Sequence, residues 1–218
     1  MTSAEMKETP LNYISPLVKS QATDELIALF SPYVTYELIP AGQRLYYCID
    51  EVNMCYLLRS GVIKVCRATD ALVIATMPSP NITGISSLLP ASHDLFLETQ
   101  SDSFIGSLTT QKAHEIIEQY NAWELLASHV TRVTANLFRR YVIMTAPTTY
   151  DILKFQLMSL MQEPEDLRLA TSTVKYITER TRLSRSTIMK MLAQLKKGGY
   201  IVMDEGILIA INSFPDKY

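Results

Sequence analysis

Residues 171–211 read TSTVKYITERTRLSRSTIMKMLAQLKKGGYIVMDEGILIAI, and this stretch decides the C-terminal fold. It predicts two short helices, of which the second runs from Arg185 to Lys197 and has Ser184 as its N-cap. Gly198-Gly199 supplies good C-cap chemistry for that helix. The runs YIVMD and ILIAI, joined by Glu205-Gly206, then predict a β-hairpin. Helix, turn, helix and hairpin in this order indicate a winged helix-turn-helix.

Charge is concentrated in the same part of the chain. The whole chain has a net charge of −2, yet residues 167–200 contain eight basic residues against the single acidic Glu179. The basic residues are Arg168, Lys175, Arg180, Arg182, Arg185, Lys190, Lys196 and Lys197. A basic module on an acidic body is typical of a chain that meets a polyanion at one end. Charge alone leaves open a solvated helix pair, and the order of the elements favours DNA.

The expected DNA contacts follow from the geometry of a recognition helix, whose N-terminal residues face base edges in the major groove. Arg185 is the candidate for a bidentate contact with guanine, worth about 1–3 kcal/mol of discrimination. Ser186 and Lys190 lie in the first two turns and are expected to reach into the same groove. Contacts with phosphate are expected from Thr173, Ser184 and Thr187, together with backbone amides at the helix starts.

The N-terminal half has a different pattern of residues. From Tyr33 to about Leu108, short runs such as YVTYELI, MCYLL, GVIKVC and ALVIATM are rich in β-branched and aromatic residues. Turn signals at Pro40-Ala41-Gly42, Ser60-Gly61 and Thr69-Asp70 separate them. Several short strands at this spacing predict a barrel or sandwich.

A helical region joins the two halves. Residues 111–145 contain no proline or glycine, and their apolar residues follow the spacing of a coiled-coil seam. The predicted seam comprises Leu126, Val130, Val133, Leu137, Tyr141 and Met144. The pattern favours a two-fold helix pair over a helix packed on its own β domain. We therefore expect an α+β chain with a β domain over 1–110, a dimerisation helix over 111–146 and a winged helix over 147–218.

The chain resembles the cyclic-AMP receptor protein/fumarate-nitrate reductase regulator (CRP/FNR) family along almost its whole length. The matching stretches are ELIPAGQRLYY, YLLRSGVIKVCR, TGISSLL, the long central helix and LSRSTIMKMLAQLKKGGYI. The resemblance implies a double-stranded β-helix of the cyclic-nucleotide-binding type (a β-roll), a homodimer and double-stranded DNA as a partner, with RNA polymerase as a further candidate. Within the family it is closest to a divergent branch linked to resistance to hydrogen peroxide.

The nucleotide pocket that this resemblance implies is degenerate. Family members that bind cyclic nucleotides have a carboxylate for the ribose, followed by an arginine and a hydroxyl residue for the phosphate. The corresponding positions here are Gly84-Ile85 and Leu95-Phe96, and the adenine contacts fall near Leu137-Phe138. The missing arginine alone removes a charge-assisted contact worth about 1.5–3 kcal/mol. Cyclic AMP is therefore not expected as a ligand.

No other cofactor is expected. The family's iron–sulfur branch uses a cysteine-rich N-terminal segment, whereas the first cysteine here is Cys48. A haem would need an axial histidine from His93, His114 or His129. Cys66, near Lys64 and Arg67, is a candidate redox thiol, although a half-buried cysteine in the β-roll is the favoured alternative.

One departure from the family pattern lies in the turn of the helix-turn-helix. Arg182 occupies the turn position that usually holds glycine, which would cost about 1 kcal/mol in a left-handed conformation.

Two function classes remain after exclusion. The start of the chain shows no secretory signal and no later apolar run is long enough to span a membrane, so a cytoplasmic location is expected. Enzymatic motifs such as GxSxG, a P-loop or HExxH are absent from the sequence, so an enzyme is not expected. The favoured function is a transcription regulator with a degenerate nucleotide pocket. The alternative is a ligand-sensing or protein-docking adaptor that no longer reads DNA.

Overall fold

The computed structural model describes residues 20–86, 94–146 and 148–215. The described chain divides into two compact units, residues 20–138 and residues 139–215, called the N-terminal and C-terminal units below. Among the described helices, none combines the length and the apolar character that a membrane crossing requires.

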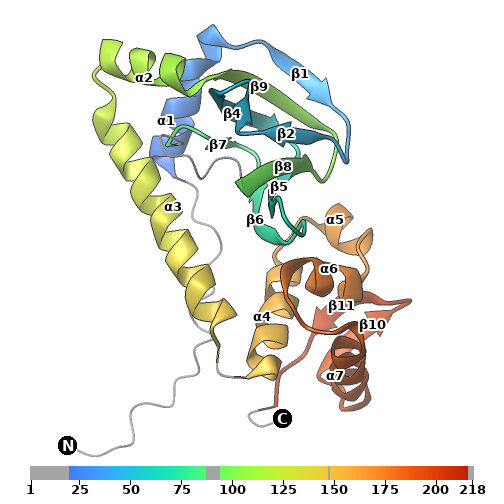
Figure 1. The fold of residues 1–218 in the computed structure, drawn as a ribbon. Helices are drawn as coiled ribbons and strands as arrows, with labels where there is room; N and C mark the ends of the chain where they lie inside the picture. The colour runs from blue at the N-terminus through green and yellow to red at the C-terminus, as the bar shows by residue number, and fades with distance from the viewer. Residues whose placement is uncertain (1–19, 87–93, 147, 216–218) are drawn as a thin grey trace, which may run out of the picture. The chain divides into compact units, whose positions relative to one another are not determined.

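The N-terminal unit is built from two antiparallel sheets (Figure 1). The chain enters through α1 (Gln21–Phe30) and a 3₁₀ turn, Ser31–Tyr33. The strands are β1 (Tyr36–Ile39), β2 (Arg44–Tyr46), β3 (Cys48–Ile49), β4 (Val52–Ser60), β5 (Val62–Arg67), β6 (Val73–Pro78), β7 (Asn81–Thr83), β8 (Leu95–Thr99) and β9 (Ser103–Thr109). One sheet has the order β1-β9-β4-β3 with β7 also paired to β4, and the other has the order β2-β8-β5-β6. The predicted α+β chain with an N-terminal β-roll is confirmed.

The space between the two sheets is filled by side chains. Alternation along β8 turns Leu95 and Leu97 toward this core. Two tyrosines, Tyr47 and Tyr56, are buried in the same cluster. The Tyr47 hydroxyl hydrogen-bonds to the Thr83 hydroxyl at 2.7 Å, and the Tyr56 hydroxyl donates to a backbone carbonyl at 2.6 Å. Both buried hydroxyls are thus satisfied, which lets large aromatic rings occupy the interior of the roll.

The predicted continuous helix over 111–146 is wrong in one respect. The region forms two helices, α2 (Thr110–Gln119) and α3 (Trp123–Met144). The break contains Asn121, which has a φ of +50°. Asparagine is among the few non-glycine residues that adopt this left-handed conformation readily, so it ends a helix without glycine or proline.

The first half of α3 packs on its own unit. Leu126 lies against a core cluster that also contains residues of α1 and α2. One turn further on, His129 is almost fully buried, and its Nδ1 lies 3.0 Å from the Thr23 hydroxyl of α1. Arg132 donates to the same hydroxyl oxygen at 2.9 Å. This polar cluster joins α1 to α3 inside an otherwise apolar contact.

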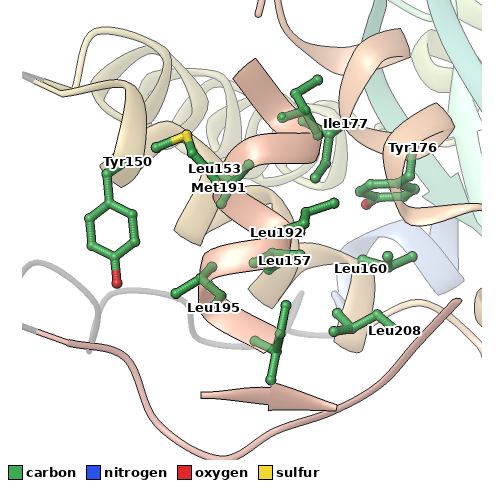
Figure 2. Close-up of a cluster of buried hydrophobic side chains, with 12 residues drawn as sticks. Tyr150, Leu153, Leu157, Leu160, Tyr176, Ile177, Met191, Leu192, Leu195 and Leu208 are labelled. Carbon is green, nitrogen blue, oxygen red and sulfur yellow. The ribbon is translucent and has the colours of Figure 1, made fainter. Parts of the chain in front are cut away.

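The C-terminal unit is a winged helix (Figures 1 and 2). Its helices are α4 (Thr149–Met161), α5 (Glu165–Leu169), α6 (Thr173–Arg180) and α7 (Arg185–Lys197), followed by the hairpin β10 (Ile201–Asp204) and β11 (Ile207–Ile211). Figure 2 shows its core, in which Leu157 of α4, Leu192 of α7 and Leu208 of the hairpin gather in one cluster. Helices α6 and α7 pack together through Ile177, Ile188 and Met191, which are buried, with Leu183 beside them.

Candidate nucleic-acid interface

The start of α7 carries a cluster of hydroxyl groups. Ser184 is the N-cap, as predicted, and its Oγ accepts a hydrogen bond from the Thr187 backbone amide at 3.1 Å. The Ser184 hydroxyl also lies 2.9 Å from that of Ser186 and 2.8 Å from that of Thr187. A helix N-terminus with exposed hydroxyls is a favourable place for a phosphate, because amide dipoles and hydroxyl donors act together.

The turn before α7 is shaped without a left-handed residue at Arg182. Thr181 is extended, with φ −137° and ψ 168°, and its hydroxyl donates to the Ile177 carbonyl at 2.9 Å. The same oxygen accepts from the Leu183 amide at 3.3 Å. Arg182 is not among the described residues with positive φ, so the strain considered for it does not arise. The Thr181 side chain organises the turn instead of a glycine.

The outward face of α7 is set by the burial of its inner face. Because Ile188, Met191, Leu192 and Leu195 are buried, a neighbouring stripe of the helix faces solvent. That stripe comprises Arg185, Ser186, Met189, Lys190, Ala193 and Lys197. The predicted contacts Arg185, Ser186 and Lys190 therefore share one exposed surface. Met189 lies among them and is 51% exposed. The sequence signal for this exposed stripe is the i, i+3, i+4 spacing of the apolar residues that face the core.

The structure corrects the prediction for Thr173. It was expected to contact phosphate, yet its side chain is completely buried and its Oγ1 has no hydrogen-bond partner. Its backbone amide donates to the Gly206 carbonyl at 2.9 Å, so that donor is also taken. The cause is the hairpin, which folds back onto the start of α6 and covers this residue.

Two of the eight basic residues counted in the sequence serve the fold. Arg168 donates through NH1 to the Leu208 and Ile209 carbonyls at 3.0 and 3.1 Å and so anchors the hairpin. Arg180 is buried and stacks on Tyr176, with its guanidinium carbon 3.6 Å from the ring centroid. The remaining basic residues, Lys175, Arg182, Arg185, Lys190, Lys196 and Lys197, are exposed.

A half-buried carboxylate, that of Glu163, completes the environment of Arg180. The Tyr176 hydroxyl donates to Glu163 Oε1 at 3.0 Å, and an Arg180 nitrogen lies 4.0 Å from the same oxygen. Burial raises the pKa of Tyr176, so its hydroxyl stays a donor across the physiological range. These groups hold α6 to the connector before α5 and are turned away from the surface.

The four positions of the predicted ligand pocket belong to packed regions. Gly84 has a φ of +85°, and a Cβ built on it would meet the Met54 carbonyl oxygen. Ile85 is buried in the core beside α2, and Leu95 packs into the interior of the roll. Phe96 is buried on the other face of β8. Each of the four is thus packed against neighbouring protein in the described part of the chain, and the assignment of a degenerate nucleotide pocket to these positions stays a prediction.

A groove of about 850 Å³ does exist elsewhere on the N-terminal unit. It is lined by residues of the β3–β4 turn, α2 and the start of α3, among them Glu51, His114, Glu118 and Trp123. His114 Nε2 hydrogen-bonds to the Ile85 carbonyl at 2.8 Å, and the Trp123 indole donates to Glu118 at 2.8 Å. These lining groups are thus engaged with one another and with the backbone.

The cysteines are poor candidates for a redox switch. Cys66 is only 2% exposed and packs with Val73 and Phe96, so it lacks the exposure that a reactive thiol needs. Burial raises the pKa of the Cys55 thiol, which disfavours the nucleophilic thiolate. None of the three cysteines, all within the described ranges, forms a disulfide. Of the histidines considered for haem, His93 lies outside the described residues, and the absence of a cofactor stays a prediction.

The predicted dimer seam divides along α3. Leu126 packs on its own unit, and Val130 and Val133 are half-buried. The side chain of Met144 lies outside the described ones. Large exposed apolar side chains occupy the second half of the helix: Leu137, Phe138, Tyr141 and Val142. The first half of α3 is thus used within the chain, and the dimer seam along the second half stays a prediction.

Comparison with known proteins agrees with this fold. Residues 149–216 match the family described as "Winged helix-turn-helix DNA binding". The chain is 30% identical over 171 residues to the "Inhibitor of hydrogen peroxide resistance" of Salmonella typhimurium. The aligned region covers 78% of this chain and 82% of the relative. The protein of the same name in Escherichia coli K12 is 30% identical over 164 residues, covering 75% of this chain and 79% of the relative.

Solved structures share the fold at low sequence identity. The c-di-GMP-responsive regulator CLP of Xanthomonas campestris has a TM-score of 0.71 at 14% identity, covering 87% of this chain and all of that one. A mutant of CooA from Carboxydothermus hydrogenoformans has a TM-score of 0.64 at 15% identity. The match covers 92% of this chain and 93% of that one. The chain belongs to the family of the inhibitor of hydrogen peroxide resistance. It ends in a DNA-binding winged helix-turn-helix and has the fold of CRP/FNR regulators. The match of residues 149–216 to a DNA-binding winged helix does not favour the adaptor alternative.

Proposed function

We propose that this protein is a cytoplasmic, homodimeric regulator that reads double-stranded DNA through α7 and lowers resistance to hydrogen peroxide. The observation that carries the proposal is the exposed surface of α7. It combines a guanidinium, a lysine ammonium and a hydroxyl-rich helix N-terminus on a rigid winged helix. Such a surface matches the donors and acceptors of the major groove and the adjacent phosphates.

Homodimerisation is proposed through the second half of α3. Leu137, Phe138, Tyr141 and Val142 are large apolar side chains on consecutive turns, and Tyr141 is 68% exposed. A contiguous apolar strip on a helix is typical of a surface that pairs with another helix. Two winged helices related by a two-fold axis would bind half-sites about 34 Å apart, which is one turn of the duplex.

The role in peroxide resistance rests on the printed name of the 30% identical relatives. It is testable by deleting the coding region and measuring survival under hydrogen peroxide, where higher survival is expected. RNA polymerase is proposed as a further partner on family likeness alone, and no residue is assigned to it. The degenerate pocket positions support a regulator that works without cyclic AMP.

Arg185→Ala is expected to lower affinity for the preferred duplex by about tenfold to a hundredfold, because a bidentate guanine contact is worth about 1–3 kcal/mol. Selection from random duplex DNA identifies that sequence for the wild-type protein, and fluorescence anisotropy then measures both proteins. Lys175→Ala is the matched control, since it removes one exposed positive charge of the same unit from α6. Equal losses in the two variants would show that Arg185 contributes only charge. No enriched sequence for the wild-type protein would reject the proposed function.

Met189 is expected to contact a thymine methyl group, because it is an exposed apolar side chain one turn beyond Arg185. Met189→Gln keeps the length of the side chain and should lower the preference for thymine at one position by about fivefold, the equivalent of one apolar contact. Met189→Leu is the control that keeps the contact apolar. A selected motif identical in the Gln variant would contradict this role.

A further inference from the structure

The tip of the wing is acidic. The hairpin between β10 and β11 turns at Glu205-Gly206, with φ angles of +44° and +87°, and Asp204 pairs with Ile207 across it. Asp204, Glu205 and Gly206 are all exposed. Neither carboxylate forms an ion pair within the described part of the chain. The tip therefore presents two negative charges to solvent.

The position of this tip is determined by two anchors. The Thr173 amide, at the first residue of α6, donates to the Gly206 carbonyl at 2.9 Å. On the next strand, Arg168 donates to the Leu208 and Ile209 carbonyls. The first turn of α6 has no acidic residue of its own. The wing tip thus places the Gly206 carbonyl at the positive end of the α6 dipole, and the exposed Asp204 and Glu205 directly precede this glycine in the chain.

That end of α6 is where a helix-turn-helix meets the DNA backbone. The first helix of the motif crosses the backbone, and helix N-termini commonly contact phosphate. Here the first amide of α6 is already bound to the wing. A phosphate approaching this end would meet Asp204 and Glu205, and like charges at close range repel until salt screens them.

We propose that Asp204 and Glu205 are an electrostatic brake on DNA binding. Their repulsion acts on the phosphates of any sequence, so it lowers affinity for all duplexes equally, while α7 carries the discrimination between them. The brake keeps binding to random DNA weak, because the exposed basic residues of the unit would otherwise attract every duplex. This inference rests on the proposed function and adds the two carboxylates that limit the affinity of the protein for DNA.

The test uses the full chain and the double variant Asp204→Asn/Glu205→Asn. Asparagine removes both charges, and Asn-Gly is a favoured pair for a hairpin turn with two positive φ angles, so folding is preserved. The control is Glu37→Gln/Glu124→Gln, which changes the net charge equally at exposed positions of the N-terminal unit. Fluorescence anisotropy measures affinity for the selected duplex and for a random duplex of the same length over a series of salt concentrations. Thermal melting checks the fold, and Glu205→Asn alone is the second variant.

The double variant is expected to bind both duplexes about fivefold more tightly at low salt, with an unchanged ratio between them and a gain that fades as salt rises. A variant that behaves like the control overturns the brake while leaving the proposed function intact. A loss of affinity for the selected duplex alone also overturns it, because the carboxylates would then contact bases. If neither the wild-type protein nor the variant binds any duplex, the proposed function fails, and the inference fails with it.

Discussion

Gly84→Ala is expected to destabilise the N-terminal unit by about 2–5 kcal/mol, enough to unfold a domain of ordinary stability. Two costs combine at this position. Gly84 has a φ of +85°, where a Cβ costs about 1–2 kcal/mol. The added methyl group would also press on the Met54 carbonyl and lie 3.1 Å from the Cys55 Cα, and such overpacking costs about 1–3 kcal/mol.

Gly42→Ala is the matched control. Gly42 has nearly the same φ, +82°, but nothing lies within 4 Å of a Cβ built on it. The two variants therefore share the backbone cost, and only Gly84→Ala adds the steric one. Urea unfolding followed by the fluorescence of Trp123, the single tryptophan, reports on the N-terminal unit. Equal destabilisation of the two variants would contradict the close contact with strand β4.

Stability of the same unit is expected to fall by about 3 kcal/mol as the pH drops from 6.5 to 4. Burial, helped by the positive charge of Arg132, lowers the pKa of His129 to about 4. In the unfolded chain the imidazole has its ordinary pKa of about 6.5. Between these values the unfolded chain binds a proton that the folded chain does not, so acid favours unfolding. Above pH 6.5 both states are neutral at this site and the stabilisation is fully present.

His129→Asn tests the origin of this pH dependence. The Asn amide oxygen can replace Nδ1 as the acceptor from the Thr23 hydroxyl, but it does not titrate. Unfolding free energies of both proteins, measured by Trp123 fluorescence at a series of pH values, should differ in slope only between pH 4 and 6.5. Other acidic groups contribute equally to both proteins and cancel in the difference. Parallel curves over that interval would show that folding does not lower the pKa of His129.

The winged helix was predictable from sequence because several local signals agree there. Ser184 before a helix, Gly198-Gly199 after it and Glu205-Gly206 between two β-branched runs each specify one backbone conformation. The buried face of α7 was also partly visible, since Ile188 and Met191 lie three residues apart. Such signals act over a few residues and need no knowledge of the tertiary fold.

The errors concern residues whose environment is created by distant parts of the chain. Thr173 is covered by a hairpin that follows it by thirty residues, so its helix-start position alone suggested exposure. The close approach of the Met54 carbonyl to Gly84 likewise could not be predicted, because it depends on a strand that is distant in the chain. Asn121 breaks the helix with no glycine or proline to mark the place. Arg168 and Arg180 count as surface charge in a sequence, although the fold uses both internally.

The two tyrosines inside the β-roll have a consequence for any effector that would enter it. Tyr47 and Tyr56 are buried and hydrogen-bonded, so a ligand must first bind a minor conformation in which a ring has left the interior. Exposing one such side chain costs about 3 kcal/mol, so that conformation would be populated at roughly one part in a hundred. The apparent affinity falls by the same factor, about a hundredfold, before any contact with the ligand is counted. Replacing Tyr47 with a smaller residue is expected to lower this penalty, because one of the two rings would no longer have to be displaced.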